Sequence, residues 1–184
     1  MANTAASREP VPKGFDPSEI GVAKDGSEEE LEAGKLVQFV SFQVGKSEYG
    51  IDIMAVREIQ GWTSVTALPN TPDYVRGVLN LRGAIVPIFD LRCRFSGKPT
   101  EATPLHVVII VAVENRIMGL LVDAVSDILT INCEQILDVP EVETQVDQRF
   151  LSGLITVDDR MVALLEINKL FDVEKLVAQV KGAK

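Results

Sequence analysis

An internal repeat constrains the fold of this chain more than any other feature of its sequence. Residues 36–59 align without a gap with residues 105–128, and residues 77–91 align with residues 153–167. Apolar positions fall on apolar positions in both alignments, and glycine falls on glycine at two expected turns, where backbone freedom matters. Chance similarity between valine-rich strands is the alternative. The repeat therefore predicts two similar structural units within one chain.

The first unit shows the alternation of apolar and polar residues that is typical of half-buried strands. We expect strands at about 36–44, 49–53, 63–68, 78–81 and 84–91. In residues 54–60, Val56 and Ile59 lie three positions apart, and this spacing predicts a short helix. Arg82 and Gly83 are expected to form a tight hairpin turn. So many short strands separated by turns favour two small barrels over a parallel sheet.

The folded domain is expected at residues 35–172, with its two repeats at about 36–95 and 105–171. Apolar residues follow a helical spacing from Leu170 onward, so residues 173–184 are expected to form the end of a C-terminal helix and a frayed tail. The expected fold class is therefore mainly all-β, with short helices and one C-terminal helix.

The first 34 residues differ in composition from the rest of the chain. They are rich in Pro, Gly, Ser, Ala and Glu and include the acidic run Glu28–Glu30. Such a composition cannot bury a core, so residues 1–34 are expected to form a disordered tail. A docking motif in this tail is the less favoured alternative.

Composition and charge exclude several classes of partner. The formal net charge of -9 argues against nucleic acid and against an anionic membrane surface, because both attract concentrated basic patches. No run of about 18 apolar residues is present, and the first residues lack the pattern of a signal peptide, so we expect a cytoplasmic protein without membrane insertion. Cys93 and Cys133 are expected to be two buried, reduced thiols.

The sequence offers no recognisable catalytic or metal-binding set. His106 is the one histidine, and its place at the start of an apolar strand favours a satisfied side chain over a general base or a metal ligand. One histidine and two distant cysteines do not define a zinc site. The glycines lie between expected strands, and none forms a phosphate-binding loop ahead of a helix. We therefore expect no enzymatic activity, no cofactor and no bound metal.

The two repeats differ in charge at one pair of positions. Glu58 corresponds to Asp127, which is also acidic, whereas Arg82 corresponds to Asp158, which has the opposite charge. A Glu–Arg ion pair is therefore possible only in the first repeat. Two interpretations are open: an ordinary surface ion pair, or a pair that orients a binding face.

Short motifs in both repeats are similar to those of a known family. They are Tyr49-Gly-Ile-Asp-Ile53, Val56-Arg-Glu-Ile59, Asn70-Thr-Pro72, Gly77-Val78, Asn80-Leu-Arg-Gly83, Ile85-Val-Pro-Ile88, Asp90-Leu91, Gly119, Val122-Asp123, Val125-Ser-Asp127 and Leu151-Ser-Gly-Leu154. With these motifs the chain resembles, from about Leu36 to Phe171, the CheW family of coupling proteins in bacterial chemotaxis. The tail before Gly34 is longer than this family leads us to expect.

The resemblance implies two intertwined five-stranded barrels of SH3-like type and a scaffold without catalysis. Such proteins bridge the cytoplasmic tips of chemoreceptors to the regulatory domain of a histidine kinase, in receptor arrays at the inner membrane. By match to the family motifs, Val56, Glu58, Gly77 and Arg82 belong to the receptor-coupling region, and Glu58 and Arg82 form a polar contact. A receptor tip is a helical hairpin, so an apolar groove between the barrels, bordered by this pair, is expected to bind it. The kinase is expected to bind the barrel ends.

Two alternative functions remain open at this point. A small-ligand-binding β-barrel would show a polar cluster facing inward, whereas both repeats show apolar inward faces. An adaptor of a chemotaxis-like pathway that controls another behaviour would share every sequence feature described above.

The tail gives a first testable prediction. Deleting residues 1–34 is expected to leave the thermal unfolding transition nearly unchanged, because that segment lacks the apolar residues needed to pack on a core. Calorimetry of the full chain and the truncated chain measures the difference. A loss of several degrees in melting temperature would show that the tail packs on the folded domain.

Overall fold

The computed structural model describes residues 35–140 and 148–170. The strands are β1 (Leu36–Val44), β2 (Ser47–Asp52), β3 (Val56–Gly61), β4 (Val75–Leu81), β5 (Ala84–Asp90), β6 (Val107–Val113), β7 (Arg116–Val122), β8 (Ala124–Asn132), β9 (Leu151–Val157) and β10 (Arg160–Leu165). The helices are α1 (Leu91–Ser96) and α2 (Ile167–Leu170), with 3-10 turns η2 (Ile53–Ala55), η3 (Cys133–Gln135) and η4 (Gln148–Phe150). The expected disordered tail at residues 1–34 and the expected C-terminal helix after residue 170 lie outside the described residues.

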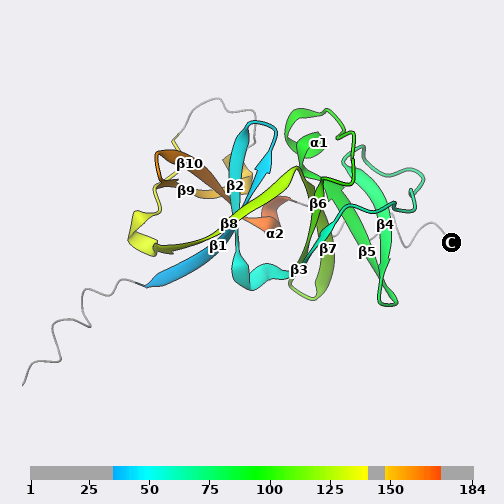
Figure 1. Cartoon of the computed structure of the whole chain (residues 1–184), viewed down its shortest axis with the longest axis horizontal. Helices are drawn as coiled ribbons and strands as arrows, with labels where there is room; N and C mark the ends of the chain where they lie inside the picture. Colours follow the sequence, from blue (N-terminus) through cyan, green and yellow to red (C-terminus); the bar gives the residue numbers. More distant parts are fainter. Residues whose placement is uncertain (1–34, 141–147, 171–184) are drawn as a thin grey trace, which may run out of the picture. The chain divides into compact units, whose positions relative to one another are not determined.

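The two sheets exchange strands between the repeats (Figure 1). One sheet, which we call barrel A, has the order β8-β1-β2-β10-β9, and the other, barrel B, has the order β3-β6-β7-β5-β4. Replacing each strand of barrel A by its repeat equivalent gives the order of barrel B. Each barrel therefore takes two strands from one repeat and three from the other. This arrangement confirms the expected pair of intertwined, five-stranded barrels.

The expected helix at residues 54–60 is wrong, because most of this segment is strand β3. The helical part is limited to η2, where the Met54 N–H donates to Asp52 Oδ1 at 2.8 Å. From Val56 the chain pairs with β6, with a bulge just after Val56. A spacing of three between Val56 and Ile59 is also compatible with a bulged strand, and both residues are β-branched, which favours a strand.

The expected strand at residues 63–68 is also wrong. Only Thr66 pairs within this segment, through an isolated bridge to Val78 of β4. Pro69 follows directly and has no backbone N–H to donate, so a ladder cannot continue through it. The helical turns of the two repeats are instead α1 and α2, which follow β5 and β10.

One apolar cluster fills the junction between the barrels. Phe42 and Ile51 of barrel A and Ile109 and Leu120 of barrel B belong to it, and each is fully buried. Each barrel has in addition a smaller apolar cluster of its own. Because the central cluster uses side chains from both barrels, burial of apolar surface couples the folding of the two.

The glycines shared by the two repeats lie within strands, so the expectation that they form turns is wrong. Gly119 of β7 is paired with Ile88 of β5. A Cβ atom at Gly119 would lie 2.4 Å from Ile88 Cδ1, and one at Gly50 would lie 2.9 Å from Leu164 Cδ2. The two sites are equivalent, because β5–β7 and β2–β10 are the parallel pairs of the two barrels. These glycines allow the side chains of the neighbouring strand to pack across them.

The two cysteines differ in environment. Cys93 on α1 is buried, as expected, but Cys133 is exposed at the start of η3, which contradicts the expected burial of both thiols. Burial raises the pKa of the Cys93 thiol above its ordinary value, and the nearby Asp90 carboxylate adds to this effect. The expected burial rested on the usual environment of free cysteines, but the chain leaves β8 at Cys133.

Asp90 is a fully buried carboxylate that fixes the loop after α1. Its side chain caps α1 by accepting the Cys93 N–H at 3.0 Å. It also accepts the Thr100 N–H and the Thr100 hydroxyl, both at 2.7 Å, and Arg76 Nη1 lies 4.0 Å away. Each carboxylate oxygen therefore has a donor, which is what a buried charge requires.

We expect Asp90→Ala to destabilise the protein by about 3 kcal/mol or more, because it leaves two backbone N–H groups and a hydroxyl without their acceptor in a buried site. The control is Asp138→Ala, which removes the same group from an exposed position and should change the free energy of unfolding by less than about 0.5 kcal/mol. Urea denaturation measures both. Equal effects of the two substitutions would contradict this role of Asp90.

Candidate binding site

The expected contact between Glu58 and Arg82 is present in the structure. Arg82 Nη2 donates to Glu58 Oε2 at 3.1 Å, and the side chains are 81% and 31% exposed. Glu58 lies on β3 and Arg82 follows β4, and these strands are the two end strands of the barrel B sheet. The pair therefore connects the two ends of the sheet across the opening of the barrel.

The turn that carries Arg82 is held in a fixed shape. Arg82 and Gly83 have φ angles of 51° and 89°, as a two-residue hairpin turn between antiparallel strands requires. The Gly83 N–H donates to Asn80 Oδ1 at 2.8 Å. This turn is the one expected from the sequence, and it holds the Arg82 guanidinium at an exposed position opposite Glu58.

The other two predicted site residues lie on the same end strands. Val56 begins β3, two residues before Glu58, and packs partly against the central apolar cluster. Gly77 is buried in β4 at a bulge, with a φ of 136°. A Cβ atom there would lie 2.2 Å from Thr66 O, so Gly77 allows the segment around Thr66 to cross β4. The structure thus gives Gly77 a role in shaping β4, whereas Val56, Glu58 and Arg82 are at least partly accessible.

The equivalent positions of barrel A carry two acids. Asp127 lies on β8, and Asp158 begins the β9–β10 turn with a φ of 47°. These two carboxylates cannot form an ion pair with each other. Barrel A instead has an ion pair between Arg160 and Glu48, at 3.1 Å, which connects β10 to β2. The Glu58–Arg82 pair is therefore a feature of barrel B alone, as the sequence predicted.

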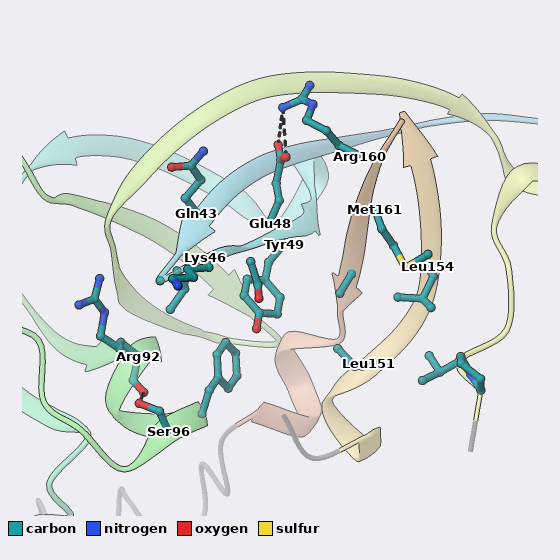
Figure 2. A pocket seen from close by; sticks show the side chains of 17 residues that line it. Gln43, Lys46, Glu48, Tyr49, Arg92, Ser96, Leu151, Leu154, Arg160 and Met161 are labelled. Carbon is teal, nitrogen blue, oxygen red and sulfur yellow. Dashed lines mark hydrogen bonds and ion pairs between the residues drawn. The ribbon is translucent and has the colours of Figure 1, made fainter. Parts of the chain in front are cut away.

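A groove is present between barrel A and α1, but the Glu58–Arg82 pair does not border it. Figure 2 shows the groove, whose volume is about 1200 Å³. It is lined by the β1–β2 turn region, by α1 and by residues of β9 and β10. Tyr49, Phe95, Leu151 and Met161 give it an apolar lining, and none of the four predicted site residues belongs to it. The sequence gives no sign of α1, which forms one side of this groove, and the expected groove beside the Glu58–Arg82 pair stays a prediction.

His106 is satisfied by its neighbours, as expected. Its Nδ1 accepts the Thr103 N–H at 3.1 Å, and its Nε2 lies 3.6 Å from Asp123 Oδ1. Within residues 35–140 and 148–170, no group of three or more His, Cys, Asp or Glu side chains could hold a metal ion. In the same residues, no helix is long and apolar enough to cross a membrane.

Fold and site together define a protein built from two strand-exchanged, SH3-like barrels, with an exposed ion pair on one of them. The family model of the CheW-like domain matches residues 38–175. The chain belongs to this family.

Individual relatives agree with this assignment. The chain is 46% identical over 134 residues to a probable chemotaxis protein CheW of Rhizobium etli, which covers 73% of this chain and 86% of that protein. It is 44% identical over 138 residues to the chemotaxis protein CheW of Rhizobium meliloti, covering 75% and 89%. The crystal structure of the scaffolding protein TtCheW from Thermoanaerobacter tengcongensis is similar with a TM-score of 0.69 and 33% identity, covering 77% of this chain and 91% of that one.

Gly77 gives a prediction for the site. Gly77→Ala is expected to destabilise the protein by about 3 kcal/mol, because it combines a strained φ with a clash against the backbone at Thr66. Gly83→Ala is the matched control: its φ is also positive, but nothing lies within 4 Å of an added Cβ atom, so only about 1 kcal/mol should be lost. Denaturant unfolding of both variants compares the two. The proposed shape of β4 is wrong if Gly77→Ala is as stable as Gly83→Ala.

Proposed function

We propose that this protein is a non-catalytic chemotaxis scaffold that couples the cytoplasmic tips of chemoreceptors to the regulatory domain of a histidine kinase. It works in the cytoplasm and is recruited to receptor arrays at the inner membrane. The observation that carries the proposal is the Glu58–Arg82 pair, which occurs on one barrel of a duplicated fold and stands exposed. Membership of the CheW-like family supports it, as do the names of the relatives.

The energetics of the pair favour a binding role over a stabilising one. An ion pair in which one partner is 81% exposed contributes about 0–1 kcal/mol to the fold. Its charges, however, remain accessible to a partner, and complementary charges at a contact control specificity and association rate. Glu58, which is 31% exposed, keeps the guanidinium of Arg82 in one orientation. We therefore assign the receptor contact to Val56, Glu58 and Arg82, with Gly77 shaping the strand beside them.

The kinase domain is proposed to bind the ends of the barrels. Two barrels offer separate surfaces for two partners, which a coupling protein needs. The small-ligand alternative is not supported, because the apolar clusters inside the barrels are built from side chains such as Ile88, Ile110, Ile155 and Leu164, each no more than 1% exposed.

Arg82→Asp tests the receptor contact, because it gives barrel B the charge that barrel A carries at the equivalent position. The fold should lose about 1 kcal/mol or less, since the side chain is exposed. Association with a receptor cytoplasmic fragment should weaken about tenfold or more, because Glu58 then faces a like charge at the contact. Binding of the kinase regulatory domain should change less. Isothermal titration with each fragment measures both affinities.

Two further variants complete this test. Arg160→Asp removes an arginine from the ion pair of barrel A and should leave receptor affinity unchanged. Glu58→Arg combined with Arg82→Glu should restore part of the lost affinity if mutual orientation is what matters. Should folded Arg82→Asp bind the receptor fragment as the wild type does, the pair is an ordinary surface ion pair and the proposal fails.

A further inference from the structure

The side chain of Asp123 joins three separate segments. Asp123 lies between β7 and β8, where the chain passes from barrel B to barrel A. Its Oδ2 accepts the Gly45 N–H at 2.6 Å and Arg92 Nη2 at 2.5 Å, and its Oδ1 lies 3.6 Å from His106 Nε2. Its own N–H donates to Gln43 O at 3.0 Å. Neither the composition nor the proposed receptor contact explains this set of bonds.

The three segments belong to different barrels. Gly45 is in the β1–β2 turn of barrel A, Arg92 is on α1 after the last residue of β5, and His106 directly precedes β6 of barrel B. The carboxylate is only 20% exposed, so its charge-assisted hydrogen bonds are weakly screened. One side chain thus connects a hairpin turn of barrel A to α1 and to the residue that precedes β6 of barrel B.

The equivalent crossover of the first repeat, between β2 and β3, has no carboxylate at this position. By the repeat alignment, Met54 occupies the position of Asp123, and Asn168 occupies that of Arg92. Met54 is 80% exposed in η2. A duplicated fold could carry these side-chain contacts at both crossovers, but Asp123 provides them only at the β7–β8 crossover. The fold itself therefore does not require the Asp123 bonds.

The same bonds shape one side of the groove. Gly45 and Arg92 both line it, and Figure 2 shows Lys46 of the turn and Arg92 of α1 on the same side. Both Gly45 and Lys46 are exposed, so the turn has little apolar contact of its own to hold it against α1. Its position therefore depends on the Asp123 carboxylate.

We propose that Asp123 is a positioning residue that fixes the β1–β2 turn of barrel A against α1, and that transmission between the two partners requires this fixed turn. The second part rests on the proposed function. A scaffold that binds a receptor on barrel B influences a partner that contacts barrel A through the junctions between the barrels, and the Asp123 bonds fix one of these junctions. Binding of the receptor fragment alone does not need the Asp123 bonds, because Glu58 and Arg82 both lie on barrel B.

The first measurement is amide hydrogen exchange of the full chain by NMR. Asp123→Ala removes the acceptor of the Gly45 N–H, so exchange at Gly45 should become at least tenfold faster, while amides of β6 keep their rates. Asp123→Asn keeps an oxygen that accepts from Gly45 but loses the charge that faces Arg92, so it should give a smaller increase. Asp138→Asn, an exposed aspartate, is the control and should change nothing at Gly45. Unchanged exchange in Asp123→Ala would overturn the positioning role.

The second measurement is receptor-dependent kinase activity in a reconstituted mixture. Asp123→Ala is expected to bind the receptor fragment within twofold of the wild type, but to reduce the receptor's effect on kinase activity at least fivefold. If Asp123→Ala exchanges faster at Gly45 but the receptor still controls kinase activity normally, the role in transmission is overturned. The Asp123 bonds would then have a structural role alone. If the Asp123 variant does not fold, Arg92→Gln removes the ion pair from the other side, keeps the acceptor of the Gly45 N–H, and is tested in the kinase measurement. Failure of the wild type to bind either fragment would refute the proposed function, and the exchange data would still decide the role of Asp123.

Discussion

The exchange of strands between the two repeats is the constraint on which the rest of the structure depends. Each barrel takes strands from both repeats, so neither repeat contains a complete sheet. The central apolar cluster, with Phe42 from one barrel and Leu120 from the other, is buried only when both barrels are formed. A barrel of this size buries too little apolar surface to be stable alone, and the shared cluster supplies what each one lacks. The repeats are therefore expected to fold as one cooperative unit.

The shared core also explains why the polar interactions differ so much in their contribution to stability. Arg94 of α1 lies over the rings of Tyr74 and Phe150, at 4.9 and 4.6 Å, and its Nε donates to Leu170 O at 3.2 Å. It therefore connects both repeats and is only partly exposed, while Asp90 is fully buried. The exposed Arg82, in contrast, contributes little to stability. Selection on stability constrains buried groups, whereas exposed groups are free to serve a partner.

Much of this organisation could be predicted from the sequence, because the repeat and the Arg82–Gly83 turn are local patterns. The helix expected at 54–60 failed for a physical reason: β3 is fixed by its pairing with β6, a strand about fifty residues away, and local spacing contains no trace of that partner. Charge asymmetry between the repeats showed that a Glu–Arg pair is possible only in the first one, and the contact of Glu58 with Arg82 was implied by the family resemblance. The groove and the bonds of Asp123 were not predictable, because they depend on how α1 packs against the other barrel.

Differences between the repeats carry the functional information in a duplicated fold of this kind. Two identical barrels would present two identical faces, and such a protein would bind one kind of partner twice. Here Arg82 stands where the other repeat has Asp158, so the exposed ion pair is present on barrel B alone. Asp123 stands where the other repeat has Met54, so the charge-assisted bonds to Gly45 and Arg92 are made at one crossover, and an exposed apolar side chain stands at the other. In the proposed function, the first difference distinguishes the two binding faces and the second holds one junction between them, and coupling of two unlike partners would use both.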